Sequence, residues 1–235
     1  MKRFYKEASA STAADGGYTV LLDAKTVKTP RRAILSLPNL PLAEAIAMEW
    51  RGQRERIDVQ TMPLTRLAFA ALDVATPERE EIEQQILKYG GNDLLCYRAE
   101  DPPELVARQA HAWDPLLEWA AGTYGARLNV GCGIKHVPQP PGAIAELRAA
   151  VARCDEFELA ALHTATTITG SVILALALAE ERVSAGEAFA AATLDETFQA
   201  EKWGIDAEAE QRRRRLLAEL TATERFLRLL AEARK

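Results

Sequence analysis

A cysteine and a histidine, two side chains that commonly bind zinc, stand close together in this chain. Cys132 and His136 are four positions apart in a segment rich in glycine and proline. That spacing is typical of half a zinc site, which needs a second pair of ligands. No matching pair follows, and Cys154 and His163 fall in different predicted helical contexts. The pattern favours an ordinary thiol and loop histidine, so neither a metal nor another cofactor is expected.

Motifs for nucleotide binding and nucleophilic catalysis are incomplete. Gly131-Cys132-Gly133 lacks the third glycine of a dinucleotide-binding loop, and no Gly-x-x-x-x-Gly-Lys-Ser/Thr phosphate loop occurs. Ser171 is outside any nucleophile elbow, and in one continuous helix His163 would lie roughly 12 Å from it along the axis. Ser171 is expected to bond a preceding carbonyl of that helix. No catalytic residue is therefore predicted, and the protein is not expected to be an enzyme.

The charge of the chain argues against nucleic acid as a partner. The formal net charge is −5 at pH 7, whereas binding to nucleic acid depends on many Lys and Arg contacts with phosphate. The arginine run from Arg212 to Arg215 has acidic neighbours, including Glu210 and Glu219. This mixture is typical of an ion-paired helix surface.

Several features indicate a cytoplasmic protein that does not insert into membranes. The three cysteines are not closely paired, which favours a reducing compartment. Met1-Lys2-Arg3 is not followed by the apolar stretch of a secretory signal. The most apolar segment, Ile168 to Ala179, is shorter than the roughly 20 residues that cross a bilayer, so we expect a buried helix there.

The N-terminal third is predicted to form a small antiparallel sheet with a covering helix. Strand-like residues occupy 18–22, after the turn signal Asp15-Gly16-Gly17, and 33–37, before Pro38. A tight turn is expected at Asp23-Ala24-Lys25. Helical spacing then predicts a helix over 42–50, which should cover the sheet, and a second one over 64–72. Thr76 should cap a further helix that starts at Pro77.

The remainder of the chain is predicted to be helical, which gives an α+β protein with a sheet domain over 1–78 and a larger all-helical domain over 79–235. The segment 129–142 should be a loop, with a short strand at 127–130. Four helices are expected from apolar spacing and helix-end signals: 101–124 with a capped start and Gly125 as its end, a central one over 159–176, one from the capping box at Ser184 to Trp203, and one over 216–230.

Segments along most of the chain resemble, in order, the Atp12 family of F1-ATPase assembly chaperones. The segments that carry the resemblance are Lys2-Arg3-Phe4-Tyr5-Lys6, Gly17-Tyr18-Thr19-Val20-Leu21-Leu22-Asp23, Glu49-Trp50, Thr61-Met62-Pro63-Leu64-Thr65, Leu95-Cys96-Tyr97-Arg98, Trp113-Asp114-Pro115-Leu116 and the final signature from Leu194 to Gly204. Two positions depart from the family pattern. Ala24 replaces a frequent glycine, and Thr197 interrupts a run that is commonly acidic.

The resemblance implies a chaperone that binds the free α subunit of F1-ATPase and prevents its aggregation before it joins the β subunit. Mitochondrial relatives would need a cleavable targeting segment before the first family strand, and the sequence has none there, so we expect a bacterial protein. We also expect it to be a monomer when it is free. By this resemblance, Asp195 and Glu196 are the positions that correspond best to the functional acidic residue of the family. Together with Phe198 and Trp203, these acids would form a partner-binding patch of acidic groups and aromatic anchors.

Two alternatives stay open at this stage. Phe198 and Trp203 could instead pack in the core, with Asp195 and Glu196 on a solvated helix face. The protein could also be an enzyme or a small-ligand-binding protein with a site near the 129–142 loop.

Overall fold

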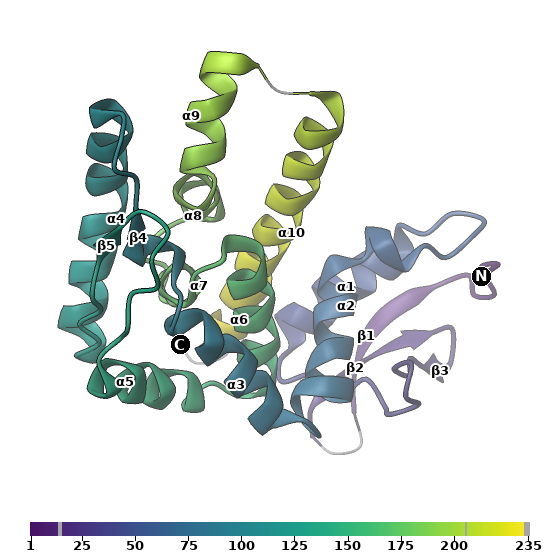
Figure 1. The fold of residues 1–235 in the computed structure, drawn as a ribbon. Coiled ribbons are helices and arrows are strands. Elements are labelled where there is room, and N and C mark those ends of the chain that lie inside the picture. The colour runs from purple at the N-terminus through teal and green to yellow at the C-terminus, as the bar shows by residue number, and fades with distance from the viewer. Residues whose placement is uncertain (14–15, 205, 233–235) are drawn as a thin grey trace. The chain divides into compact units, whose positions relative to one another are not determined.

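The computed structural model describes residues 1–13, 16–204 and 206–232 of the chain. Within these ranges, a three-stranded antiparallel sheet lies near the N-terminus and α-helices make up most of the rest (Figure 1). The predicted α+β class is thus confirmed.

Residue contacts divide the chain into two units. The first unit contains residues 1–79, 155–161 and the chain from Ala222 onward, and the second contains 80–154 and 162–221. The second unit begins at Glu80, one residue later than the predicted start at 79, but two later segments return to the first unit. The division into domains at 78/79 stays a prediction.

The first unit is built on a sheet with the strand order β1-β2-β3 and a covering helix. Its elements are β1 (Ala8–Thr12), β2 (Tyr18–Leu22), β3 (Lys25–Thr26), α1 (Leu40–Arg51) and α2 (Pro63–Ala70). Ala10 lies opposite Val20 in the β1–β2 pair, and α1 packs on both of these strands. The predicted strand at 33–37 makes only isolated bridges, between Ile34 and Lys28 and between Leu37 and Tyr18.

The predicted turn between β2 and β3 is confirmed, and one of its residues has left-handed backbone geometry. Asp23, and not Ala24, has a positive φ of 54°. The Asp23 carboxylate accepts hydrogen bonds of 3.0 Å from the amides of both Lys6 and Glu7. These bonds stabilise the left-handed residue. Ala24 does not have a positive φ, so the turn does not need a glycine at that position. In the preceding turn, Asp15 lies outside the described residues.

Two side chains hold the helices of the first unit in place. Asn39 caps α1 by accepting from the Leu42 amide at 2.8 Å, and it donates to the Leu229 carbonyl at 2.9 Å. Glu49, on α1, caps α2 from outside that helix, because its carboxylate accepts from the Leu64 and Thr65 amides at 2.8 Å. The first amides of α2, which have no acceptor from a local capping residue, thus find one on the neighbouring helix.

The prediction that Thr76 caps the following helix is wrong. A π-helical turn, Ala71–Ala75, continues α2, and Thr76 ends it. Both the amide and the hydroxyl of Thr76 donate to the Ala71 carbonyl at 2.9 Å. The hydroxyl therefore bonds to the turn before Thr76 and does not cap the helix after it. The next helix begins only at Arg79.

The second unit is formed mainly by helices. Its elements, some of which extend into the first unit, are α3 (Arg79–Gly90), β4 (Tyr97–Arg98), α4 (Pro103–Tyr124), β5 (Gly131–Cys132), α5 (Pro141–Ala152), α6 (Glu156–Thr169), α7 (Val172–Ala179), α8 (Ala185–Ala192), α9 (Leu194–Trp203) and α10 (Ala207–Ala231). α4 ends at Gly125 as predicted, with φ 75°, but it starts after Pro102 without a side-chain cap. The short strand lies at 131–132, after the predicted 127–130, and pairs in parallel with β4.

The predicted central helix over 159–176 is two helices that break at Gly170. Gly170 has φ +69°, and Ser171 caps α7 by accepting from the Leu174 amide at 3.0 Å. The Ser171 hydroxyl bonds to the Asp93 carboxylate, and not to a preceding carbonyl as expected. The fully buried Asp93 carboxylate accepts from the Ile173 amide at 3.2 Å and from the Leu95 amide at 3.1 Å. The first amides of a helix lack intrahelical partners, so these bonds offset part of the cost of burying the carboxylate.

The predicted helix from Ser184 to Trp203 is also two helices. The capping box of Ser184 and Glu187 is confirmed, but the chain leaves helical geometry at Thr193, with φ −108° and ψ 20°. The Thr193 hydroxyl bonds back to the Phe189 carbonyl at 2.8 Å. α9 consequently starts as a separate helix with its own direction (Figure 1).

We expect Glu49→Ala to lower the free energy of unfolding by about 2–3 kcal/mol, because two amides and the Thr65 hydroxyl lose a half-buried acceptor. Glu44→Ala is the matched control on the same helix, since the Glu44 side chain is 57% exposed. It should change stability by less than about 0.5 kcal/mol. Equal effects in chemical denaturation would contradict the capping role of Glu49.

We expect the stability of the protein to depend on the protonation of Asp93. Burial is the main cause that raises the pKa of its carboxyl from 3.8 to about 6. The folded state then binds the proton more tightly, so the contribution of Asp93 to stability is greatest below pH 3.8 and falls as the pH rises to about 6. Relative to Asp93→Asn, the wild-type protein should lose up to about 3 kcal/mol over this interval. Urea unfolding at several pH values measures this difference, and a constant difference would refute the assignment.

Candidate partner-binding site

α9 carries all four residues that the sequence assigns to partner binding, and their spacing divides them between two faces. Asp195 and Phe198 are three positions apart and share one face, whereas Glu196 and Trp203 are seven positions apart, about two helical turns, and share another. Gly204, with φ 80°, ends the helix directly after Trp203. The geometry therefore separates two pairs that the sequence could only place together.

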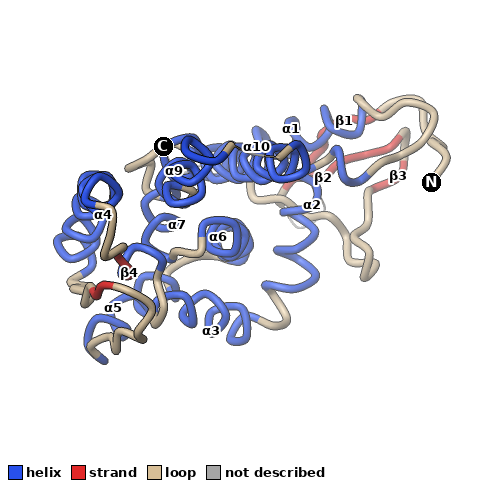
Figure 2. Tube along the Cα trace, turned by 45° about the horizontal axis from the view of Figure 1, so that its top comes forward, coloured by secondary structure: helices blue, strands red, loops and turns tan. Residues whose placement is uncertain are grey.

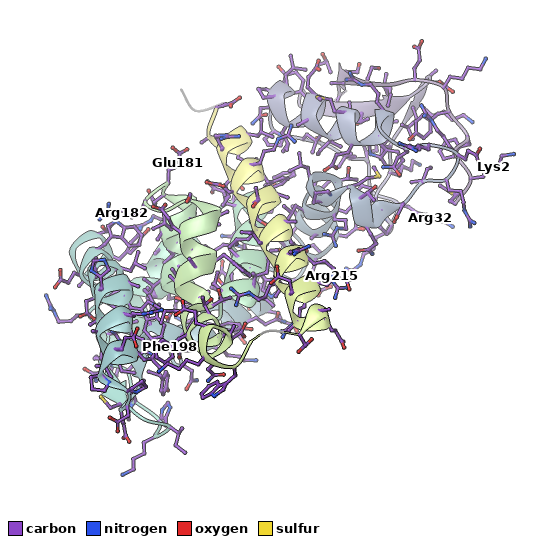
Figure 3. All side chains as sticks on the ribbon, turned by 90° about the horizontal axis from the view of Figure 1, so that it is seen from above. Lys2, Arg32, Glu181, Arg182, Phe198 and Arg215 are labelled. Atoms are coloured by element: carbon purple, nitrogen blue, oxygen red, sulfur yellow. The ribbon has the colours of Figure 1, made fainter. Side chains whose placement is uncertain are left out.

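The inner face of α9 packs against α4. Asp195 accepts a 2.7 Å hydrogen bond from the side-chain amide of Gln109, which is itself buried and binds the Ala99 amide at 2.8 Å. Phe198 is only 3% exposed and lies between α9 and α4 (Figure 3). In this structure both residues hold α9 against α4, because the Asp195 carboxylate is bonded to Gln109 and the Phe198 ring is buried.

Two cations cover the ring of Phe198. The guanidinium carbon of Arg108 lies 5.2 Å from the ring centroid, and the ammonium of Lys202 lies 4.3 Å from it. Arg108 also binds Glu104 and Glu201 at 2.8 Å. Hydrogen bonds to Glu201 and then to Glu104 are the main causes that raise the pKa of Arg108. These contacts fix the outward end of α9 to α4 through several weak interactions.

The outer face of α9 presents Glu196. Its side chain is 65% exposed, and one carboxylate oxygen lies 3.5 Å from Nη1 of Arg213 on α10. Nη2 of Arg213 donates to the Thr197 hydroxyl at 2.9 Å, which orients the guanidinium. Nη1 is buried and makes no hydrogen bond within the described residues. Glu196 is thus only loosely paired, and most of its carboxylate remains accessible to another cation.

Trp203 is the most exposed aromatic side chain among the large apolar residues of the described chain, at 77%. A tryptophan normally buries most of its large ring, and exposed aromatic rings are common anchors of protein interfaces. Its position one residue before Gly204 places it at the end of α9, next to the connection to α10. The prediction of an exposed anchor therefore fits Trp203 better than Phe198.

A groove of about 600 Å³ lies between α9, α10 and the C-terminal end of α6, all within the second unit. Glu196 and Trp203 both line it, together with Arg213, whereas Asp195 and Phe198 do not. Further lining residues are Leu94, Thr167, Gly170, Gln199, Asp206 and Leu216. The groove combines apolar side chains with the carboxylates of Glu196 and Asp206 and the guanidinium groups of Arg212 and Arg213. Such a mixed lining suits a partner surface that is partly apolar and carries a basic group for Glu196.

Sequence reasoning missed two features of this groove. Arg213 was assigned to an ordinary ion-paired surface, but it orients toward Thr197 and Glu196, while Arg214 binds Glu210 at 2.9 Å. Arg213 differs from the other arginines of the run because it faces Glu196 on the neighbouring helix, and the sequence alone does not show which residues face each other. Thr167 was missed because the break at Gly170 was not expected, and a glycine inside an apolar helical pattern was the available signal.

The 129–142 loop, where the alternative function would need a site, brings one histidine into contact with two polar side chains. The Tyr97 hydroxyl, the Asn92 amide oxygen and Nδ1 of His136 lie within 3.4 Å of one another, and Cys132 is exposed. In the part of the chain that the structure describes, no three His, Cys, Asp or Glu residues are grouped so that they could hold a metal ion. The same described ranges contain no helix long and apolar enough to span a membrane.

Comparisons with known proteins agree with this architecture. Residues 2–121 match the family described as "ATP12 chaperone protein". The protein atp12, mitochondrial, of Schizosaccharomyces pombe is 26% identical over 215 residues, which are 86% of this chain and 74% of that protein.

Solved structures resemble nearly the whole chain. The crystal structure of Atp12 from Paracoccus denitrificans has a TM-score of 0.92 with 43% identity and covers 97% of both chains. The Atu1473 protein of Agrobacterium tumefaciens, described as a candidate chaperone, has a TM-score of 0.93 with 42% identity over 97% of this chain and 86% of that one. The family match spans more than half of the sequence, and the structural matches extend it through α10. The chain therefore belongs to the ATP12 chaperone family.

Proposed function

We propose that this chain is an assembly chaperone that binds the free α subunit of F1-ATPase and keeps it from aggregating until it joins the β subunit. Membership of the ATP12 chaperone family supports the role. The observation that carries the contact site is the groove on which an accessible carboxylate, Glu196, and an exposed ring, Trp203, stand together. The protein acts by binding alone and catalyses no reaction.

The chemistry of the groove fits an unassembled subunit. Such a subunit exposes apolar interface that would otherwise associate nonspecifically, and a chaperone must cover it reversibly. Trp203 and the apolar groove walls would supply affinity through burial of apolar surface. Glu196 would attract a basic group on the α subunit and set its register, which raises the association rate more than the affinity.

The four sequence-assigned residues have different parts in this proposal. Glu196 and Trp203 contact the α subunit directly. Asp195 and Phe198 act from the inner face, where the bond to Gln109 and the burial against α4 hold α9 in place. We further propose that the protein acts as a free monomer in the bacterial cytoplasm and needs no cofactor, since the solved structures that it resembles include bacterial proteins.

The proposal is tested by co-expression of this chain with F1 α and, separately, with F1 β. We expect a stoichiometric complex with α alone, which keeps α soluble in a light-scattering assay and dissociates when β is added. A chain that co-purifies with neither subunit, and leaves α aggregation unchanged, would overturn the proposal.

Glu196→Lys should reduce the association rate with α by about tenfold, with a weaker dependence on salt, because the attraction to a basic group is replaced by repulsion. The exposed Glu118, on α4, lines none of the described grooves, so Glu118→Lys is a control with the same change in net charge. Stopped-flow binding at two salt concentrations measures both variants. Identical rates for the two variants would remove Glu196 from the contact.

Trp203→Ala should weaken α binding by about tenfold through loss of an anchor ring. Because this side chain is 77% exposed, the variant should keep its stability to within about 0.5 kcal/mol. Phe198→Ala is the contrasting variant, since the loss of a ring that is 3% exposed should cost about 3–5 kcal/mol of stability. Calorimetric titration with α and thermal unfolding separate the two effects. Wild-type affinity of a folded Trp203→Ala protein would contradict the anchor role.

A further inference from the structure

A second hollow lies beside the groove at α9 and also belongs to the second unit. Its volume is about 810 Å³, and its lining residues are Gln85, Lys88, Tyr89, Asn92, Leu94, Tyr97, His163, Thr167 and Gly170. Leu94, Thr167 and Gly170 also line the groove at α9, so the two hollows adjoin at these residues. Residues of α9 line the first hollow, and residues of α3 line the second. In both backbone views α6 lies between these two helices (Figure 2).

The place where the hollows meet is rigidly held. The Leu94 amide donates to the Gly170 carbonyl at 3.2 Å, and the neighbouring Asp93 is fully buried with its carboxylate bonded to the start of α7. Gly170 has a positive φ and no side chain, so the chain turns here without filling the space above it. A fixed floor lowers the entropic cost of binding a partner across both hollows.

The second hollow is chemically suited to an apolar segment of chain. Tyr89 and Tyr97 provide ring surface, and aromatic side chains are enriched at protein interfaces. Nε2 of His163 lies 2.9 Å from the Gln85 amide oxygen, and burial lowers the pKa of this imidazole, so it is neutral at pH 7. Lys88, which is exposed, is the charged residue that lines the second hollow.

The charges give the combined surface a direction. Glu196 and Asp206 line the part at α9, where Arg213 is already engaged by Thr197 and Arg212 is exposed, and Lys88 lines the part at α3. A bound segment with a basic side chain near Glu196 and an acidic side chain near Lys88 would match both ends. The reversed orientation would bring like charges together, which is unfavourable at an interface.

We propose that the two hollows form one docking groove for a single apolar segment of the free F1 α subunit, with a basic side chain toward Glu196 and an acidic one toward Lys88. This inference rests on the proposed function and extends the contact from Glu196 and Trp203 across Thr167 to Tyr89 and Tyr97. α9 is then one wall of a longer site and not the whole of it.

The test blocks the middle of the groove. Thr167 is exposed where the hollows meet, and its hydroxyl donates to the His163 carbonyl at 2.9 Å. Thr221, on α10, is a matched control, because it is also exposed, donates to the Leu217 carbonyl at 2.8 Å and lines neither hollow. Thr167→Trp should weaken binding of purified F1 α by at least about tenfold, whereas Thr221→Trp should stay within about twofold of the wild type. Circular dichroism verifies that both variants fold.

A charge variant tests the direction of the segment and replaces the blocking variant if that one does not fold. Lys88→Glu should weaken α binding about fivefold, and Lys88→Arg should leave it unchanged. Folded Thr167→Trp and Lys88→Glu proteins that bind α like the wild type would overturn the extended groove while leaving the chaperone role intact. A wild-type chain without affinity for α would refute both. A wild-type dimer that Thr167→Trp dissociates in sedimentation would assign the groove to a second copy of this chain and overturn the proposal.

Discussion

The buried carboxylate of Asp93 is the interaction on which the second unit depends most. It accepts hydrogen bonds from the amides of Leu95 and Ile173, and the Ser171 hydroxyl also bonds to it. The carboxylate thereby fixes the start of α7, a helix whose residues 172–178 are all buried, to the segment that follows α3. Next to it, the Leu94 amide donates to the Gly170 carbonyl, and these two residues line both hollows. A charge in the core is costly, and here it is retained where several donors converge on it.

The segments by which the sequence resembles its family meet in pairs in the structure. Glu49 binds the amides of the Thr61–Thr65 segment and caps α2. Arg98 stacks 5.1 Å from the ring of Trp113 and binds Asp114 at 2.7 Å. The presence of these segments in order therefore indicated the fold, because residues of one segment contact residues of another. Their pairing could not be read from one sequence, which gives no distances between segments.

Apolar periodicity identified most helices, and glycines with positive φ marked the ends of α4 and α9 as predicted. It failed at Gly170 and Thr193, where two helices continue the same apolar pattern after a change of direction. At Thr193 the local bond of its hydroxyl to the Phe189 carbonyl accompanies the break. At Gly170 the break has a tertiary partner, because the distant Asp93 carboxylate accepts a hydrogen bond from the start of α7, and local propensity does not contain this contact. For the same reason the sequence placed acids and aromatics of α9 in one patch, whereas the helix turns Asp195 and Phe198 inward and only Glu196 and Trp203 toward the groove.

The central claim is that the α subunit binds along the groove that α9 shares with the Gly170 turn. Hydrogen–deuterium exchange of this chain with and without F1 α tests it most directly, because it locates the contact without any substitution. The account predicts that bound α slows exchange in α9, in the C-terminal turn of α6 and in the α3 to β4 connection, and leaves the exposed surface of α4 unchanged. Protection confined to the three-stranded sheet and α1, with unaltered exchange around α9, would contradict it.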